Sequence, residues 1–379
     1  MNIEKYRDEF PIVNEYVYLN HAAHSPASKR VVEAVKKCLE SLESKGEYSI
    51  NVRETKKPFA KLINASVDEV ALITNTSQGL NIVANTLKFN SGSNVVINDM
   101  EYPSNVYPWL KLKKKGVEVR VVKSVNGIIH LEAYEKAIDD KTVAVAISHV
   151  EWMNGFKHDL KPLAEIAHDH GAYLVVDAVQ SAGAMKIDVK KMDIDFLACG
   201  CYKWLLGPTG AGYLYIRSEL IEKITPPFVG WASVKYKEDP LTFNTSKIEW
   251  RENASKFEIG SMSHFSFAGA QAAIELILEV GIENIEKRIL QLTKYLVDRL
   301  LEAGYEIQSP LNDEYRSGIV NFKIANGYKI QKKLAENKII TSFRGGGIRV
   351  SPHFYNNKED IDKLVNKVEQ ISKISISPP

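Results

Sequence analysis

The chain has 379 residues, of which 45% are hydrophobic and 25% are charged, so it is long enough to bury a large core and to form two domains. Its 49 basic and 47 acidic side chains leave a formal charge of +2, which argues against nucleic acid as a partner. The three cysteines, Cys38, Cys199 and Cys201, are too few for a disulfide framework, and no histidine or further cysteine cluster completes a metal site around them.

The sequence also lacks the signals of membrane insertion. Its first ten residues contain no apolar stretch of the kind found in signal peptides, and no run of about eighteen apolar residues occurs anywhere. We therefore expect no membrane segment. The sparse cysteines favour a reducing compartment, with the cytoplasm as the default.

Short apolar runs alternate with helical patterns between residues 70 and 216. The expected strands are Val70–Ile73, Val95–Ile97, Val117–Val122, Val143–Ile147, Leu174–Val176, Phe196–Ala198 and Tyr213–Ile216. This alternation predicts an α/β fold with a mainly parallel sheet flanked by helices. Ligands of such sheets bind at the carboxyl ends of the strands, so the polar residues that follow these runs are the first site candidates.

The pattern changes after Ile216, where a long irregular stretch over residues 226–258 begins. Beyond it, amphipathic helices are expected at Ala268–Glu279, Ile282–Ala303 and Glu359–Ile374, and strands near Ile319–Ile324 and Ile348–Val350. We expect a large domain over residues 15–265 and a smaller α+β domain formed by residues 1–14 and 266–379.

Lys203 and Asp177 carry the strongest chemical signal. Lys203 follows a buried run and precedes a glycine-rich turn, where an ordinary surface lysine is out of place. A lysine with a lowered pKa can form a Schiff base with the aldehyde of pyridoxal phosphate, and a carboxylate paired with the pyridine nitrogen keeps that ring electron-withdrawing. Asp177 ends an apolar run and is the candidate carboxylate. A solvated lysine and a helix-capping aspartate explain each residue alone, but the pair favours the cofactor site.

The segment Thr74–Asn81 supplies hydroxyl and backbone N–H groups in front of a predicted helix, Gly79–Leu87. A helix N-terminus of this kind binds phosphate. An ordinary N-cap is the simpler interpretation of the segment alone. Its position upstream of Asp177 and Lys203 favours a phosphate site.

Three further residues suit the same site. Tyr102 can stack on a pyridine ring, and Gln180 can hydrogen-bond the ring hydroxyl. Arg349 can bind a substrate carboxylate through two parallel hydrogen bonds. A packed loop tyrosine and a surface arginine are the alternatives, so these assignments depend on their context.

Together these motifs resemble the class V aminotransferases. This fold type I pyridoxal-phosphate group also includes cysteine desulfurases, selenocysteine lyases, kynureninase-like enzymes and isopenicillin N epimerase-like proteins. The resemblance extends from Tyr18-Leu-Asn-His-Ala-Ala23 to Tyr355-Asn-Asn-Lys-Glu-Asp360. It implies a large domain with a mainly parallel sheet, a smaller α+β C-terminal domain, pyridoxal 5'-phosphate as cofactor, a small amino acid as substrate, and a homodimer.

The resemblance also implies roles for single residues. Lys203 would form the Schiff base with the cofactor. The other implied cofactor contacts are Thr76, Ser77, Gln78, Tyr102, Asp177, Gln180, Tyr202 and, reaching the neighbouring subunit's phosphate, Ser261. The implied substrate contacts are Arg349 and Ala23.

Two features depart from the desulfurase pattern. Trp152 or Met153 stands where desulfurases have an asparagine near the cofactor, and residues 311–349 contain no cysteine. Desulfurases use a thiol in that stretch to accept sulfur. Desulfuration of that kind is therefore disfavoured, and Cys199 and Cys201 are expected to be buried strand residues.

The expected reaction begins with removal of the substrate's Cα proton by Lys203, while Arg349 holds the carboxylate. Transamination is the first hypothesis, because it needs only Lys203 as acid and base. A C–S or C–Se lyase of the desulfurase type and an isopenicillin N epimerase-like activity are the alternatives. A noncatalytic pyridoxal-phosphate carrier has no need of Arg349, and a nucleotide-binding dehydrogenase would carry an early Gly-x-Gly-x-x-Gly.

Overall fold

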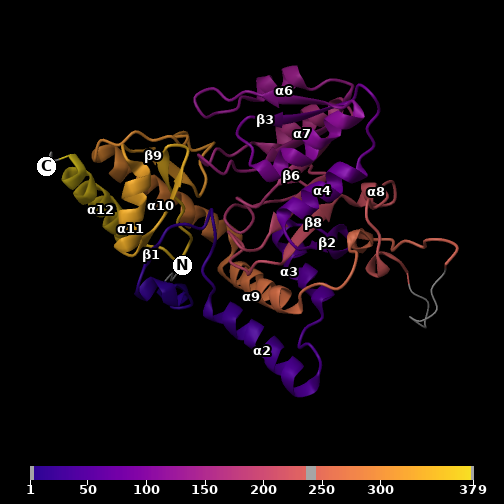
Figure 1. The fold of residues 1–379 in the computed structure, drawn as a ribbon, viewed down its shortest axis with the longest axis horizontal. Coiled ribbons are helices and arrows are strands. Elements are labelled where there is room, and N and C mark those ends of the chain that lie inside the picture. Colours follow the sequence, from indigo (N-terminus) through magenta and orange to yellow (C-terminus); the bar gives the residue numbers. More distant parts are fainter. Residues whose placement is uncertain (1–3, 236–244, 377–379) are drawn as a thin grey trace.

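The computed structural model describes residues 4–235 and 245–376, and its centre is a seven-stranded sheet in the order β2-β8-β7-β6-β5-β3-β4 (Figure 1). The strands are β2 (Val70–Ile73), β3 (Asn94–Asn98), β4 (Glu118–Val122), β5 (Thr142–Ser148), β6 (Tyr173–Asp177), β7 (Phe196–Gly200) and β8 (Gly212–Ile216). Strands β3 to β7 pair in parallel, whereas β8 runs antiparallel to β7 and β2. The predicted mainly parallel sheet and its strands are confirmed.

Hydrophobic clusters cover both faces of this sheet, because side chains alternate along each strand. Val145 and Ile147 of β5 enter one cluster, and Ala144 and Ala146 enter the other. The first cluster receives side chains from α2 (Lys29–Lys45), α3 (Lys56–Ile63), α6 (Leu131–Ala137), α7 (Leu160–Asp169) and α9 (His264–Val280). The second receives them from α4 (Thr76–Thr86), α5 (Tyr107–Leu110) and α8 (Ser218–Ile221). Strands buried on both faces explain why their sequences read as continuous apolar runs.

A smaller α+β part lies to one side of the large sheet (Figure 1). It contains α10 (Ile282–Glu302), α11 (Gly327–Glu336), α12 (Lys358–Ile376) and an antiparallel sheet of β9 (Val320–Lys323), β11 (Ser342–Arg344) and β12 (Gly347–Val350) in the order β11-β12-β9. Its third cluster includes Leu296, Phe322, Ile348 and Leu364. Strand β1 (Val17–Tyr18) joins it by pairing in parallel with β10 (Ile339–Ile340).

The expected helices of this region correspond to α9, α10 and α12, whereas α11 and β11 are not among the expected elements. Within the irregular stretch 226–258, the described residues form the short 3₁₀ turns Trp231–Ser233 and Ala254–Phe257. Residues 236–244 of that stretch lie outside the described part. No single helix of residues 4–235 and 245–376 is long and apolar enough to span a membrane, and α9 and α10 meet those criteria only as a pair bent by 81°.

The predicted domain limits, 15–265 against 1–14 and 266–379, stay a prediction. Phe267 and Ile274 of α9 pack in the first cluster with α2, beside which α9 lies in Figure 1. Leu19 packs in the third cluster instead. We propose that the main boundary lies near Gly281, where α9 ends and α10 turns away.

Candidate functional site

The predicted residues Asp177, Lys203 and Thr76 lie at or just beyond the carboxyl ends of β6, β7 and β2. Strand β6 ends at Asp177, β7 continues into the turn that carries Lys203, and β2 leads into α4, which begins at Thr76. Asp177 and Lys203 are 2% and 8% exposed. A carboxylate and an amine are therefore buried near each other at the edge where α/β sheets bind ligands.

Lys203 presents its amine between two aromatic rings. Its Nζ lies 5.7 Å from the ring centre of Tyr102 and 5.6 Å from that of Tyr202. Burial lowers the pKa of Lys203 to about 8; Asp177 opposes this shift, and Arg349 adds to it. Within the described residues no hydrogen bond engages Nζ, so the amine is available for chemistry.

The backbone around Lys203 is fixed on both sides. Its carbonyl accepts hydrogen bonds from Ser25 Oγ and from the N–H of Leu206. Leu206 has a φ of 59°, in the left-handed region that costs a branched side chain energy, and this closes the turn. The strained residue lies three positions after the predicted catalytic lysine and is hydrogen-bonded to its carbonyl.

Among the described residues, one carboxylate oxygen of Asp177 has a hydrogen-bond partner and the other has none. Oδ1 accepts a hydrogen bond of 2.9 Å from the N–H of Val179. Burial raises the pKa of Asp177 to about 6, while the Val179 N–H and Lys203 oppose that shift. The free oxygen and the buried position suit a partner that carries a proton on nitrogen, as the pyridine of the cofactor does.

The start of α4 carries the residues of the predicted phosphate site. Ser77 Oγ lies 2.8 Å from Ser104 Oγ, and Thr76 Oγ1 accepts a 2.9 Å hydrogen bond from the N–H of Gly200. The N–H of Gln78 is already engaged by Asn75 Oδ1, which caps the helix. The first helical N–H groups, at Thr76 and Ser77, and the two serine hydroxyls are therefore the best phosphate donors.

Gly79 lets α4 lie directly on the sheet. A Cβ atom at this position would be 2.8 Å from Ala198 Cβ and 2.8 Å from Ile73 Cδ1. Such a separation is well below van der Waals contact, so a larger residue would displace the helix. Gly79 thus helps to bring the N-terminus of α4 close to the Lys203 turn.

Tyr102 and Trp152 form an aromatic wall that leads to Arg349. Their ring centres are 5.3 Å apart in an edge-to-face arrangement. Arg349 is 2% exposed, donates from Nη1 to the Trp152 carbonyl, and donates from Nε to Ser342 Oγ. Burial, and then the nearby Arg344, lower the pKa of Arg349, although a guanidinium stays charged at neutral pH. Arg349 retains donors with which it can bind a carboxylate.

Behind this wall, Glu101 and Glu151 are buried on the two loops that carry Tyr102 and Trp152. The Asn98 amide donates 2.9 Å hydrogen bonds to both carboxyl groups. Glu101 also accepts from the N–H and the hydroxyl of Ser148. Glu151 Oε2 has no partner among the described residues. Burial raises the pKa of Glu151 to about 8, and burial together with the charge of Glu151 raises the pKa of Glu101 well above its usual value, so this pair keeps a proton near neutral pH. We place the shared proton on Glu151, because the donors around Glu101 suit a charged carboxylate.

The side-chain amide of Gln180 joins two segments of the site by hydrogen bonds. Its Nε2 donates 2.9 Å to the Ala22 carbonyl, and its Oε1 accepts 2.9 Å from Trp204 Nε1. This places the loop of Ala23 beside the Lys203 turn. One amide hydrogen of Gln180 remains for the ring hydroxyl.

Ser261 does not join these residues within one chain. It is exposed and lines a separate groove of about 400 Å³ together with Ile50, Arg53, Trp231 and His264. The prediction that it serves a neighbouring subunit is not tested by a single chain.

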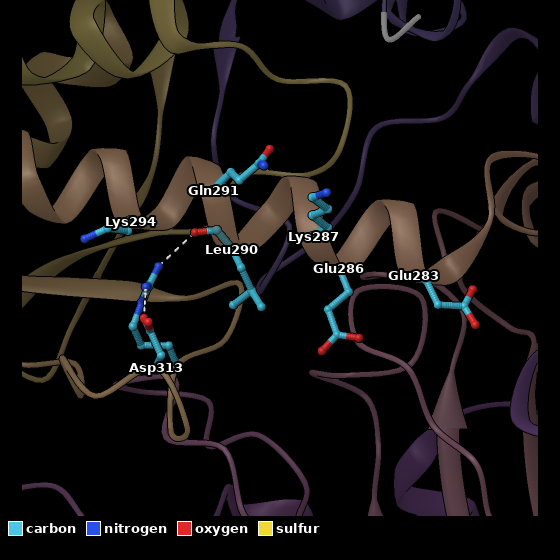
Figure 2. A pocket seen from close by; sticks show the side chains of 8 residues that line it. Glu283, Glu286, Lys287, Leu290, Gln291, Lys294 and Asp313 are labelled. Atoms are coloured by element: carbon cyan, nitrogen blue, oxygen red, sulfur yellow. Dashed lines mark hydrogen bonds and ion pairs between the residues drawn. The ribbon is translucent and has the colours of Figure 1, made fainter. Parts of the chain in front are cut away.

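A further groove, of about 510 Å³, runs along α10 (Figure 2). Arg316 is the buried charged side chain among the residues that line it, and its guanidinium donates hydrogen bonds to Asp313 and to the Leu290 carbonyl. None of the predicted site residues lines it. We therefore assign the chemistry to the Lys203 site.

Several residues that complete the Lys203 site were not predicted. Ser104 and Ser342 support the phosphate cradle and Arg349, while His24 Nδ1 lies 3.0 Å from the Tyr202 carbonyl. Ser104 could have been predicted from the sequence, because it lies two residues after Tyr102. Ser342 could not have been predicted from the sequence, because only the pairing of β11 with β12 brings it opposite Arg349.

Comparisons with known proteins identify the family of this chain. The class V aminotransferase family model matches residues 17–364. A probable cysteine desulfurase of Methanothermobacter thermautotrophicus is 32% identical and aligns over 98% of both chains. An uncharacterized aminotransferase of Bacillus subtilis, YcbU, is 31% identical over 96% of this chain and 97% of its own.

The solved structures add a close match in three dimensions. The apo cysteine desulfurase from Thermococcus onnurineus superimposes with a TM-score of 0.89 at 28% identity, over 98% of both chains. This match includes the predicted smaller α+β part as well as the large sheet. With the family model spanning nearly the whole chain, the protein belongs to the class V aminotransferase family of pyridoxal-phosphate enzymes.

Proposed function

We propose that this enzyme is an aminotransferase acting on a small amino acid. The observation that carries the proposal is the buried amine of Lys203, which no hydrogen bond engages among the described residues and whose pKa is influenced by the charges of Asp177 and Arg349. The predicted roles of these residues stand as part of this proposal.

The residues present fit pyridoxal phosphate. When bound, the cofactor provides an aldehyde for amines and an electron-withdrawing ring. Asp177 would face the ring nitrogen, Tyr102 would stack on the ring, and Thr76 and Ser77 would hold the phosphate. Tyr202 would share the phosphate, because its ring and Thr76 lie close together: a Cβ atom added at Gly200 would be 3.3 Å from Tyr202 Cε1 and 3.4 Å from Thr76 Oγ1.

Lys203 would move the proton at the substrate's Cα. An amine whose pKa lies near 8 can both accept and return a proton near neutral pH, which is what a single acid and base requires. Arg349 fixes the substrate's carboxylate, and Ser342 and the Trp152 carbonyl orient the guanidinium. Transamination needs no further group of this chain.

A desulfurase-type reaction with an enzyme thiol is not supported by the described residues. Cys38, Cys199 and Cys201 are all buried, and burial raises the pKa of both Cys199 and Cys201. The hairpin that ends at Arg349 contains no cysteine. A lyase that releases sulfur without an enzyme thiol is the second candidate, because relatives at 32% and 30% identity are named probable cysteine desulfurases.

We also propose a homodimer in which a second copy covers the groove at Ser261. Phe228, Trp231 and Ile259 expose 55%, 56% and 43% of their surface near this groove. Apolar side chains gathered in this way favour contact with a protein surface. In that assembly Ser261 would reach the neighbouring phosphate.

The test is a product assay on the cofactor-loaded protein. A panel of L-amino acids is incubated with and without an α-keto acid, and keto acid, sulfide and alanine are measured. Turnover that requires the keto acid supports transamination, and sulfide released without it makes the enzyme a lyase. Lys203→Ala abolishes either activity, and a variant that keeps full activity would overturn the assignment of Lys203.

A further inference from the structure

Arg344 lies on the same face of the β11–β12 hairpin as Arg349. In this antiparallel pair Ser342 is opposite Arg349, and Arg344 is opposite Gly347. Because alternate residues of a strand share a face, Arg344 and Arg349 are diagonal neighbours, about 7–8 Å apart at the backbone. The other face of the hairpin carries Ile348, which packs in the third cluster. The arginine face is therefore the one turned toward the Lys203 site.

The backbone of Arg344 is fixed against the large domain. Asn321 Nδ2 donates 3.0 Å hydrogen bonds to the carbonyls of Arg344 and of Met153. Met153 follows Trp152, whose carbonyl binds Arg349. The backbone of Arg344 and the guanidinium of Arg349 are thus both tied to the segment Trp152–Met153.

The charge of Arg344 affects the pKa values of two residues of the site. After burial, Arg344 is the next cause that lowers the pKa of Arg349, and it also contributes to the lowered pKa of Lys203. These two effects agree with the diagonal position found from the strand register.

Arg344 has no acidic partner among the described residues. It is exposed, and its guanidinium donates to the Phe343 carbonyl. Arg349 likewise contacts a hydroxyl and a carbonyl, and no carboxylate. A neutral amino acid has one carboxylate, which Arg349 can bind. The guanidinium of Arg344 would then have no anion to bind.

We infer that Arg344 binds a second carboxylate and that the substrate is a dicarboxylic amino acid. The inference rests on the proposed function, since it names the substrate class of the same site. Arg349 would hold the α-carboxylate and Arg344 the side-chain carboxylate. Two guanidinium groups at this spacing give two charge-assisted contacts on one ligand.

The test begins with ligands that do not react. Succinate and glutarate are titrated calorimetrically into the cofactor-loaded protein, with butyrate and pentanoate as monocarboxylates of matched length. We expect one dicarboxylate to bind at least about tenfold more tightly than its matched monocarboxylate. Arg344→Gln should reduce that ratio about tenfold, and Arg344→Lys should retain part of it. Lys329→Gln, which removes an exposed charge from α11, is the control and should leave the ratio unchanged.

Turnover then separates this inference from the proposed function. Aspartate or glutamate should have a higher kcat/KM than alanine, and Arg344→Gln should reduce that preference about tenfold. Equal binding of both ligand classes, or an unchanged ratio in Arg344→Gln, would overturn the inference while leaving transamination of a neutral amino acid intact. Dicarboxylate binding through Arg344 with no transamination would support the inference and refute the proposed reaction.

Discussion

Asp177 is a carboxylate that the folded chain buries almost completely, so its protonation is linked to folding. Its pKa rises from 3.8 to about 6 because of burial. The contribution of the neutral carboxyl group to the free energy of unfolding is therefore fully present below pH 3.8. About 3 kcal/mol of stability is lost as the pH rises from there through 6. We expect Asp177→Asn to make the cofactor-free protein more stable than wild type at pH 7 and to weaken cofactor binding. Urea unfolding measured at pH 4 and pH 7 checks this, and a variant less stable at pH 7 contradicts it.

The buried pair Glu101 and Glu151 allows a second test of single residues. If Glu151 holds the proton, Glu151→Gln replaces one neutral group by another and should change stability by less than about 1 kcal/mol. Glu101→Gln places an amide against the donors of Ser148 and Asn98 and should cost about 2–3 kcal/mol. Denaturant unfolding of both variants compares them directly. The reverse order of costs would place the proton on Glu101.

At the scale of the elements, the proposed phosphate site depends on where α4 lies on the sheet. Gly79→Ala adds a methyl group where Ala198 and Ile73 leave no space, and we expect a loss of about 1–3 kcal/mol despite the better helix propensity of alanine. Cofactor affinity should fall as the N-terminus of α4 moves. Asn85→Ala, later in the same helix, is the matched control for propensity and should bind the cofactor normally. Equilibrium titration of pyridoxal phosphate measures both, and unchanged affinity in Gly79→Ala would mean that α4 is not displaced.

The strands, and the residues that end them, could be predicted because burial on both faces leaves a continuous apolar run in the sequence. Asp177 and Lys203 were predictable in the same way, since each follows such a run. The pairing of Glu101 with Glu151 was not, because it depends on β3 and β5 being neighbours in the sheet. The position of Arg344 depends on the register of a glycine-rich hairpin, which no periodicity in the sequence reveals.

At the scale of the whole molecule, Ser261 is the predicted site residue that lies apart from the Lys203 site within one chain. The segment around Ser261 lines the groove near Phe228, Trp231 and Ile259, whose exposed apolar surface a second copy would bury. A charge introduced there should break that contact without disturbing the cores, because these side chains already face solvent.

We therefore expect Phe228→Asp and Ile259→Asp to convert a dimer into monomers and to weaken cofactor binding at least about tenfold. The loss of cofactor follows because each site would then lack the neighbouring chain's Ser261. Leu301→Asp, at an apolar position 48% exposed on α10, is the control and should remain dimeric. Light scattering gives the mass and cofactor titration the affinity. Monomers that bind the cofactor normally would show that each chain holds its own phosphate without Ser261 from a partner, and a wild-type protein that is already monomeric would overturn the dimer itself.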